Sequence, residues 1–411
     1  MHRFLMGIGL LSLMSCASAR MSDHVPDDLF RAGRYEEAAA KLKEGLAREG
    51  ENGRDSLLYL LDTGLALHAA GQFTESNKYF AQADKVAEIK DYTSLSTEGA
   101  TLITSENVKS YKGEDFENVL ISVYETMNYA LLGDFENALV EARRVNTKLY
   151  KMVNDGQRKY KQNAFARYIS AIMYESQGNW NDAYIDYKNT YDIEPGFVGI
   201  GRDLWRVATL NGMSDDAQNW AQRFNLSSAD LDSARALMPK AGKAEVVVFY
   251  ENGISPVKQA NPQFRTLPRF YPRYNPVSEA QVEVNGQVKG STEKLHDIQA
   301  TAIENLDEKY GGMIAKKIAG IAAKELIGAE VERQTNSPLL GFLTRVVMYE
   351  TDQADIRSWN LLPRDLQIAR ITVPPGTYSV RVLPVGGSAS NVRTIQVGAG
   401  KKVFVDFRYT P

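Results

Sequence analysis

The pattern of apolar and polar positions changes character near Lys240. Before this residue, apolar side chains recur with the period of amphipathic helices. After it, segments such as 245–250 are rich in β-branched and aromatic residues and end at turn signals such as Asn252-Gly253. We therefore expect an α+β protein. An all-α array over 27–235 should precede a mixed domain over 243–411, which contains an antiparallel β-sheet and a long helix.

A short sequence motif recurs in the first half of the chain. A glycine is followed by an aromatic residue two positions later, a small residue five positions later and, in most copies, a large apolar residue nine positions later. The copies are Gly33-Tyr35-Ala38-Leu42, Gly71-Phe73-Ser76-Phe80, Gly133-Phe135-Ala138-Ala142 and Gly178-Trp180-Ala183-Tyr187, with a weaker one from Gly212. In an antiparallel helix pair, the glycine permits the turn, the aromatic residue begins the second helix and the small residue allows close approach.

This spacing resembles that of tetratricopeptide repeats. Pro195 follows the fourth copy at the position where that family places a helix-ending proline. The unequal distances between copies indicate a degenerate array with an insertion near 87–111. Stacked helix pairs form a curved array whose concave surface usually binds peptides or proteins. We expect the motif aromatics to lie in the core: Tyr35, Phe73, Phe135, Trp180 and Tyr187.

The second half begins and ends with strand patterns. Residues 281–288 alternate around Asn285-Gly286, which predicts a hairpin. The strand-rich end over 367–409 predicts an antiparallel sheet or small sandwich, with strands at 367–373, 377–383, 393–397 and 401–409.

Between these strands, residues 295–333 predict a long amphipathic helix, and 339–349 a second helix that packs against it. One stripe of the long helix is apolar: Ile314, Ile318, Ile321, Ala322 and Leu326. We expect this stripe to pack into the core. The alternative is a helix that lies on a membrane surface.

The segment 256–276 contains five prolines, so it must run extended. Its basic and aromatic side chains make it the candidate recognition strip, which comprises Lys258, Arg265, Arg269, Tyr271 and Arg273. Arginine pairs with carboxylate or phosphate, and aromatic rings stack on sugars or peptides. The favoured alternative is a wrapping loop whose aromatic side chains anchor it to the sheet.

Cys16 is the only cysteine, and it follows a short apolar segment over 4–14 that is too short to span a bilayer. The run Leu13-Met14-Ser15-Cys16 resembles a bacterial lipoprotein signal. This resemblance implies that residues 1–15 are removed, that Cys16 is acylated and that 16–26 form a tether. Because Ala17 rather than Asp follows the cysteine, an outer-membrane anchor facing the periplasm is favoured. The alternative is an ordinary secretory signal cut at 17–19.

Composition excludes several classes of function. The formal charge of −3 does not suit a nucleic-acid partner. The four histidines lie far apart in sequence, and the chain lacks the common catalytic and metal-binding motifs, so we expect no catalysis, metal or cofactor. An enzymatic alternative would be supported if Glu114, Glu117, Asp355 and Arg357 met in one cleft.

Nearly the whole chain resembles a family of bacterial lipoproteins with degenerate tetratricopeptide-like repeats, which is defined by architecture rather than by activity. The resemblance rests on Cys16, 111–117 (Tyr-Lys-Gly-Glu-Asp-Phe-Glu), 140–145 (Val-Glu-Ala-Arg-Arg-Val) and 354–359 (Ala-Asp-Ile-Arg-Ser-Trp) with Leu362-Pro363. Some relatives belong with envelope lipoproteins that serve peptidoglycan synthases. We expect a lipid-anchored envelope scaffold that binds protein partners through its helical groove. The alternative is a cell-wall glycan-binding lipoprotein that acts through the C-terminal domain.

Overall fold

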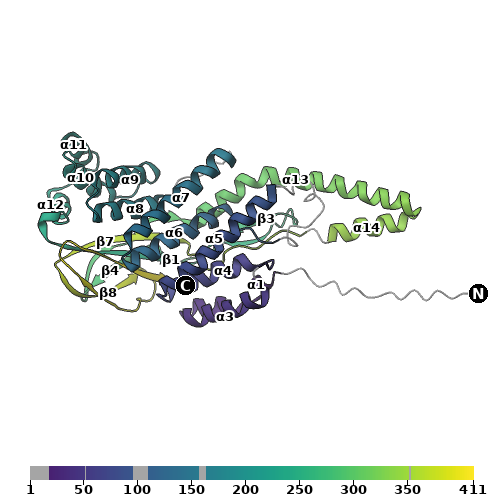
Figure 1. The fold of residues 1–411 in the computed structure, drawn as a ribbon, viewed down its shortest axis with the longest axis horizontal. Helices are drawn as coiled ribbons and strands as arrows, with labels where there is room; N and C mark the ends of the chain where they lie inside the picture. Colours follow the sequence, from purple (N-terminus) through teal and green to yellow (C-terminus); the bar gives the residue numbers. More distant parts are fainter. Residues whose placement is uncertain (1–17, 51, 96–109, 157–162, 351–352) are drawn as a thin grey trace, which may run out of the picture.

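The computed structural model describes residues 18–50, 52–95, 110–156, 163–350 and 353–411, so Cys16 lies outside the described residues. The first half consists of antiparallel helix pairs. After the short α1 (Ala19–Ser22), the pairs are α2 (Val25–Arg31) with α3 (Tyr35–Glu49), α4 (Ser56–Ala69) with α5 (Phe73–Leu95), α6 (Asp115–Leu132) with α7 (Phe135–Gly156), α8 (Ala164–Ser176) with α9 (Trp180–Ile193), and α10 (Ile200–Leu210) with α11 (Ser214–Arg223); α12 (Ser228–Ala236) follows. This TPR-like array agrees with the expected fold (Figure 1).

The recurring sequence motif begins at the turn of each helix pair. Its glycines have positive φ angles between 73° and 76°, namely Gly33, Gly71, Gly133, Gly178 and Gly212. The four motif aromatics, Tyr35, Phe73, Phe135 and Trp180, are the first residues of α3, α5, α7 and α9. The expectation that they lie in the core is therefore wrong for these four, which are only half-buried at the start of their helices, whereas Tyr187, one turn or more into α9, is fully buried, as are Ala38, Ala138 and Ala183. Pro195 follows the end of α9 at Ile193.

The second half contains two four-stranded sheets. The first has the order β10-β1-β7-β6 and the second β5-β4-β8-β9, while β2 and β3 form a separate hairpin. The strands are β1 (Ala244–Asn252), β2 (Val257–Ala260), β3 (Pro268–Tyr271), β4 (Ala280–Val284), β5 (Gln287–Ser291), β6 (Glu293–Asp297), β7 (Asp365–Val373), β8 (Gly376–Pro384), β9 (Arg393–Val397) and β10 (Lys402–Tyr409). The α+β class is therefore confirmed. One pairing differs from a purely antiparallel sheet: β10 runs parallel to β1, because the chain crosses from β9 in the second sheet back to the edge of the first.

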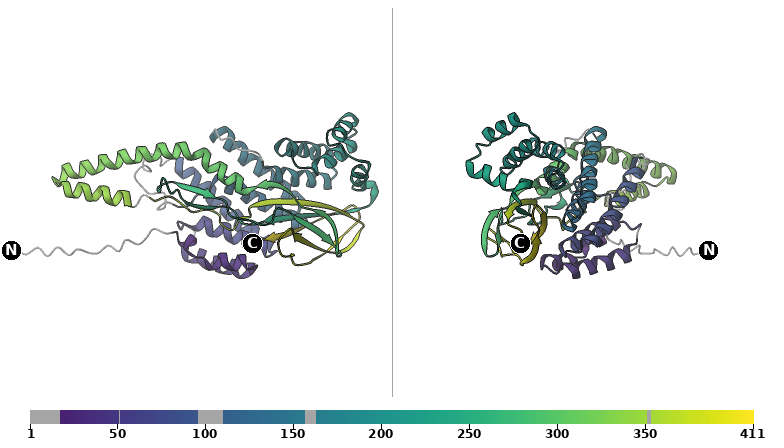
Figure 2. Two further views of the ribbon diagram at one scale, coloured as in Figure 1. Left: turned by 180° about the vertical axis from the view of Figure 1, so that it is seen from behind. Right: turned by 60° about the vertical axis from the view of Figure 1, so that its left-hand side comes forward.

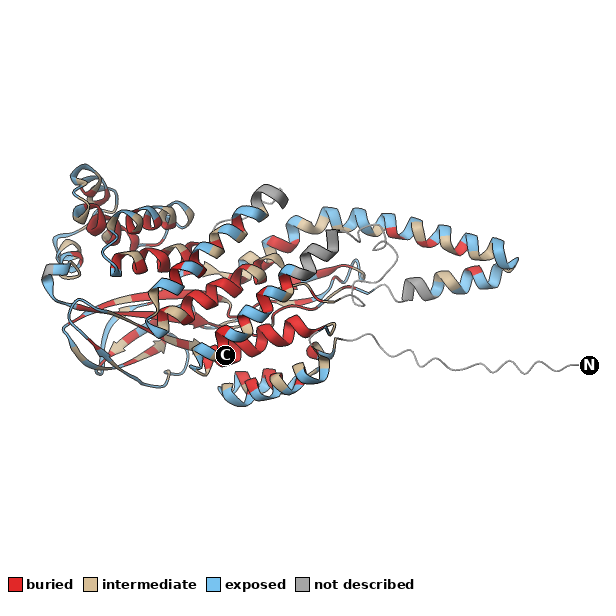
Figure 3. Cartoon of the chain, viewed as in Figure 1, coloured by how far each residue is buried: buried red, intermediate tan, exposed pale blue. Residues whose placement is uncertain are grey.

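The molecule is layered, with helices on one face of the first sheet and the second sheet on its other face (Figures 1 and 2). All nine residues of β1 are buried, as expected for a strand covered on both faces (Figure 3). Val247 and Phe249 belong to the core shared with the helices, whereas Val246 and Val248 belong to the core between the sheets. One continuous core therefore joins the helical array to the first sheet.

The long helix α13 (Ile298–Thr335) and α14 (Pro338–Glu350) form a hairpin that projects from the body (Figure 1). Only the first part of α13 packs on the body, through residues such as Ile298, Ala302 and Leu306. The expectation that its apolar stripe is core is wrong: Ile318 is 64% exposed and Leu326 73% exposed. The reason is that small residues form the contact with α14, since a Cβ on Gly341 would lie 2.8 Å from the carbonyl oxygen of Gly328.

The tether expected over 16–26 is largely structured in its described part. Arg20, on α1, is 2% exposed and forms ion pairs with Asp62 at 2.7 Å and with Asp27. A buried guanidinium requires charged partners of this kind, so α1 is fixed to the helical array. The chain is therefore held to the body from residue 18 onward.

Candidate functional site at the interface of helices and sheet

The helices α4, α6 and α8 face the first sheet. Phe165 on α8 lies 5.6 Å from Phe249 on β1, between ring centroids. Tyr124 on α6 donates a hydrogen bond to the Glu251 carboxylate on β1. All of α4, from Ser56 to Ala69, is buried. The chain's own sheet therefore covers this face of the array, which is the surface that sequence reasoning assigned to a protein partner.

A buried ion network joins the helices to this sheet. Arg370 on β7 contacts Glu175 on α8 at 3.2 Å, Asp203 on α10 at 2.9 Å and Glu245 on β1 at 2.5 Å. Arg206 on α10 contacts Glu175 and Asp203, both at 2.8 Å. Lys402 on β10 adds a third cation, 3.2 Å from Glu175.

The charges in this network balance, with three carboxylates facing three cations. Burial by itself raises the pKa of a carboxyl group. Arg206, Lys402 and Arg370 outweigh this effect and hold the pKa of Glu175 well below its usual value. Arg370 and Lys402 likewise lower the pKa of Glu245 to about 2, against the effect of its burial. Glu175 and Glu245 are therefore ionised at neutral pH.

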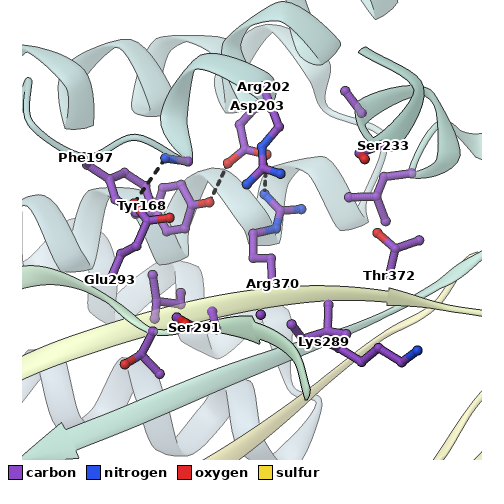
Figure 4. A pocket seen from close by; sticks show the side chains of 18 of the residues that line it. Tyr168, Phe197, Arg202, Asp203, Ser233, Lys289, Ser291, Glu293, Arg370 and Thr372 are labelled. Atoms are coloured by element: carbon purple, nitrogen blue, oxygen red, sulfur yellow. Dashed lines mark hydrogen bonds and ion pairs between the residues drawn. The ribbon is translucent and has the colours of Figure 1, made fainter. Parts of the chain in front are cut away.

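A pocket of about 280 Å³ opens beside this network, between α10, α12 and strands β5 to β7 (Figure 4). Tyr168 donates its hydroxyl hydrogen to Asp203 on one wall. Glu293 accepts backbone N–H groups of Val198 at 3.1 Å and Gly199 at 3.2 Å, just before α10. Hydroxyl groups complete the lining: Ser233, Ser291, Thr292 and Thr372. The pocket offers polar contacts to a small ligand, and its lining residues include no histidine or cysteine.

The structure separates the members of the candidate recognition strip. Lys258 on β2 is buried, pairs with Glu114 and donates to the Arg357 carbonyl oxygen at 3.3 Å. It is therefore an internal cation rather than a ligand contact. The other four stay at the surface of the β2–β3 segment, where Arg265 and Arg269 are exposed and Tyr271 and Arg273 half-buried.

The four residues of the enzymatic alternative do meet, but in a buried cluster around Tyr111. Arg357 lies 5.3 Å above the Tyr111 ring and pairs with Asp355 at 2.7 Å. Glu117 accepts the Tyr111 hydroxyl hydrogen at 2.5 Å and the Trp359 backbone N–H at 2.7 Å. Glu114 pairs with Lys258, as described above.

The two glutamates of this cluster titrate differently. Burial and the charge of Glu114 raise the pKa of Glu117 to about 7. Burial also raises the pKa of Glu114, but the charges of Lys258 and Lys309 outweigh this effect and lower the pKa to about 2. None of the four cluster residues lines the pocket of Figure 4. The cluster instead joins the repeats to the segment that precedes β7.

Comparisons with known proteins give little beyond the repeat architecture. No protein-family model matches the chain, and no curated protein matches it. A crystal structure of MamA is 14% identical with a TM-score of 0.35, over 53% of this chain and 92% of that one. A Podosopora anserina putative kinesin light chain with TPR-like repeats is 14% identical with a TM-score of 0.36, over 55% and 98%. MamA from Desulfovibrio magneticus RS-1 is 16% identical with a TM-score of 0.34, over 54% and 98%. Similarity at this level carries no inference about function.

Within the part of the chain that the structure describes, no helix combines sufficient length with sufficient apolar character to cross a bilayer.

Proposed function

We propose that this protein is a lipid-anchored adaptor of the bacterial cell envelope, which binds a protein partner rather than transforming a substrate. Acylation of Cys16 would hold it at the periplasmic face of the outer membrane. The support for the anchor is the sequence around Cys16, and the support for the binding role is the projecting hairpin of α13 and α14.

The observation that carries the binding role is the exposed apolar surface of this hairpin. On α13, Ile314, Ile318 and Ile321 follow helical spacing and are 37%, 64% and 48% exposed. The exposed apolar residues of α14 also follow helical spacing: Leu339, Phe342, Leu343 and Val346 are 64%, 58%, 45% and 37% exposed. Exposed apolar surface of this extent on a protein marks an interaction site. Because the chain's own sheet covers α4, α6 and α8, the hairpin is the better candidate surface.

The occupant that fits this surface is a protein with an apolar groove. Side chains spaced three, four and seven positions apart on a helix are the usual anchors of helix-in-groove recognition. Helices that bind anionic membrane surfaces carry an excess of Lys and Arg. Residues 311–350 instead contain five Lys or Arg and four Glu, so the charge is nearly balanced. A protein groove is therefore favoured over a lipid surface.

The anchor is tested by metabolic labelling of the full-length protein with a fatty acid in bacterial cells. We expect label on the unchanged chain and its complete loss in Cys16→Ala. The Cys16→Ala protein should also move from the membrane fraction to the soluble periplasmic fraction. An unlabelled wild-type chain would contradict the anchor.

The hairpin is tested by photo-crosslinking in living cells, with the photoreactive residue placed at position 314 or 339. The double variant Ile318→Glu with Phe342→Glu should reduce the crosslinked partner about tenfold or more, because anchor residues dominate such interfaces. The matched control is Val288→Glu with Val392→Glu, which are 51% and 53% exposed but lie outside the hairpin.

Three outcomes would contradict the hairpin proposal. Crosslinks only to lipid would indicate a membrane surface, and crosslinks only to a second copy would indicate self-association. Equal loss in the control variant would show that the effect is not specific to the hairpin. Circular dichroism of both double variants checks that the fold is intact.

The alternative function is binding to cell-wall glycan through the β2–β3 segment. It is supported by exposed aromatic and basic side chains there, since Phe264 is 54% and Tyr274 86% exposed beside Arg265 and Arg269. Sedimentation with purified sacculi separates the two functions. This alternative would be favoured if the wild-type protein sediments with sacculi and the double variant Arg265→Ala with Arg269→Ala does not.

A further inference from the structure

Three potential metal ligands point at one another where the helical array meets the first sheet. They are His68 near the end of α4, Glu251 on β1 and Asp406 on β10. His68 Nε2 lies 3.3 Å from Glu251 Oε1 and 3.6 Å from Asp406 Oδ2. The side chains of His68 and Glu251 are 0% exposed, and that of Asp406 is 9% exposed.

Each of these three side chains has one buried polar atom that makes no hydrogen bond. His68 Nε2, Glu251 Oε1 and Asp406 Oδ1 are buried without a hydrogen-bond partner. Such unsatisfied buried groups are rare in proteins, because each one costs free energy. Here two of them, His68 Nε2 and Glu251 Oε1, face each other at 3.3 Å, and the third belongs to the Asp406 carboxylate, whose other oxygen, Oδ2, faces His68 Nε2 at 3.6 Å. This convergence is the observation that points to a bound ion.

The remaining polar atoms of His68 and Glu251 are held by neighbouring groups. Asn128 uses its amide nitrogen to donate to Ser76 at 2.9 Å and to Asn77 at 2.7 Å. Its amide oxygen therefore accepts a hydrogen bond from His68 Nδ1, at 2.6 Å. This arrangement places the proton on Nδ1 and directs the Nε2 lone pair toward the carboxylates, as in metal sites where a carbonyl group orients the histidine.

Glu251 is oriented in the same way. Its Oε2 atom accepts hydrogen bonds from the Tyr124 hydroxyl and from Arg408 Nη1 at 3.1 Å, which leaves Oε1 to face His68. All three ligand atoms lie within 4.8 Å of one another. Neighbouring ligands of a tetrahedral ion with bonds of about 2.0–2.1 Å are separated by about 3.3 Å. The distances from His68 Nε2 match this spacing with little movement.

We propose that His68, Glu251 and Asp406 bind one Zn²⁺ ion, which fastens the helical array to the sheet, with water as a fourth ligand. One imidazole and two carboxylates suit Zn²⁺, whereas Ca²⁺ and Mg²⁺ prefer ligand sets made only of oxygen atoms. The site is separate from the apolar hairpin, and the proposal does not depend on the adaptor function.

The competing arrangement is a protonated histidine between the two carboxylates. Burial lowers the pKa of His68, but the adjacent carboxylates of Asp406 and Glu251 outweigh this effect and raise the pKa to about 10. A proton and a zinc ion would thus compete for the same lone pair. Direct measurement of the metal distinguishes the two arrangements.

The test measures zinc bound to the full-length protein in detergent. The protein is stripped with a chelator and titrated with Zn²⁺ against a chromophoric competitor, and its metal content is measured by mass spectrometry. We expect one Zn²⁺ per chain and at least a hundredfold weaker binding in His68→Gln. Asn128→Leu, which removes the orienting carbonyl group together with the amide hydrogen bonds to Ser76 and Asn77, should weaken binding about 10- to 100-fold. The control His24→Gln changes an exposed histidine and should bind as the wild type does.

A second measurement covers the case in which the His68 variant does not fold. Co²⁺ added to the stripped wild-type protein should give the absorption bands of a four-coordinate ion with nitrogen and oxygen ligands. Failure of the wild-type protein to take up Zn²⁺ or Co²⁺ would overturn the proposal and leave a buried ion pair. Equal zinc affinity in a folded His68→Gln protein would overturn it as well.

Discussion

Replacing Arg370 with Met is expected to lower the free energy of unfolding by about 3–5 kcal/mol at pH 7, as measured by denaturant titration. Arg370 is the cation that contacts Glu175, Asp203 and Glu245 together. The variant leaves these three buried carboxylates with Arg206 and Lys402 alone, so one negative charge loses its counterpart. The matched control is Arg381→Met, whose surface partner is Glu283, and its unfolding midpoint should hardly move.

The loss caused by Arg370→Met should also depend on pH. In the wild type, the pKa of Glu245 is lowered to about 2 from an ordinary value of 4.5. Its contribution to stability is therefore present above about pH 4.5 and is lost as the pH falls from there toward 2. Without Arg370 this contribution of Glu245 is smaller. The difference in free energy of unfolding between the wild type and Arg370→Met should therefore decrease as the pH falls from 4.5 toward 2. A difference that stays constant from pH 7 to pH 3 would argue against an ionic origin.

Replacing Trp359 with Ala is expected to cost about 3–5 kcal/mol of folding free energy. Trp359 is 1% exposed and packs against Phe80 and Tyr124, with ring centroids 5.8 Å and 5.7 Å away. Its removal opens a cavity where the repeats meet the segment before β7. Because one core joins the helices to the first sheet, the remaining structure should still unfold in a single transition.

Trp180→Ala provides the comparison for Trp359→Ala. Trp180 begins α9 and is only half-buried. Its replacement should therefore lower the free energy of unfolding by less than half of the loss caused by Trp359→Ala. Thermal unfolding followed by both circular dichroism and fluorescence measures the two effects. Two separate transitions in the wild-type protein would contradict a shared core, and equal losses in the two variants would contradict the role given to burial.

The elements were predictable because local chemistry specifies them. The sequence predicts a hairpin around Asn285-Gly286, and both residues have the positive φ angles, 48° and 77°, that such a turn requires. The stretch 295–333 predicts the helix that is observed as α13, from Ile298 to Thr335. Periodicity and turn residues act over a few positions, so one sequence is enough to read them.

The relative placement of these elements was not predictable in the same way. Charged residues inside apolar strands, such as Glu245, Glu251 and Arg370, are a signal of buried partners, but the partners lie more than a hundred residues away. The stripe with Ile318 has the spacing of a core face, and only the tertiary structure shows that nothing in the described chain covers it. The meeting of His68 with Glu251 and Asp406 likewise depends on how the array docks on the sheet.

The burial of Arg20 limits the distance between the folded body and a membrane to which Cys16 would be anchored. If Cys16 is acylated as proposed, only two residues separate the lipid from Ser18, which spans at most about 7 Å. The end of the molecule that carries α1 would rest almost against the phospholipid headgroups. The hairpin projects from the body on the same side as α1 (Figure 1), so it would lie near the membrane as well. We therefore expect a protein that binds the hairpin to be located at or near the membrane surface.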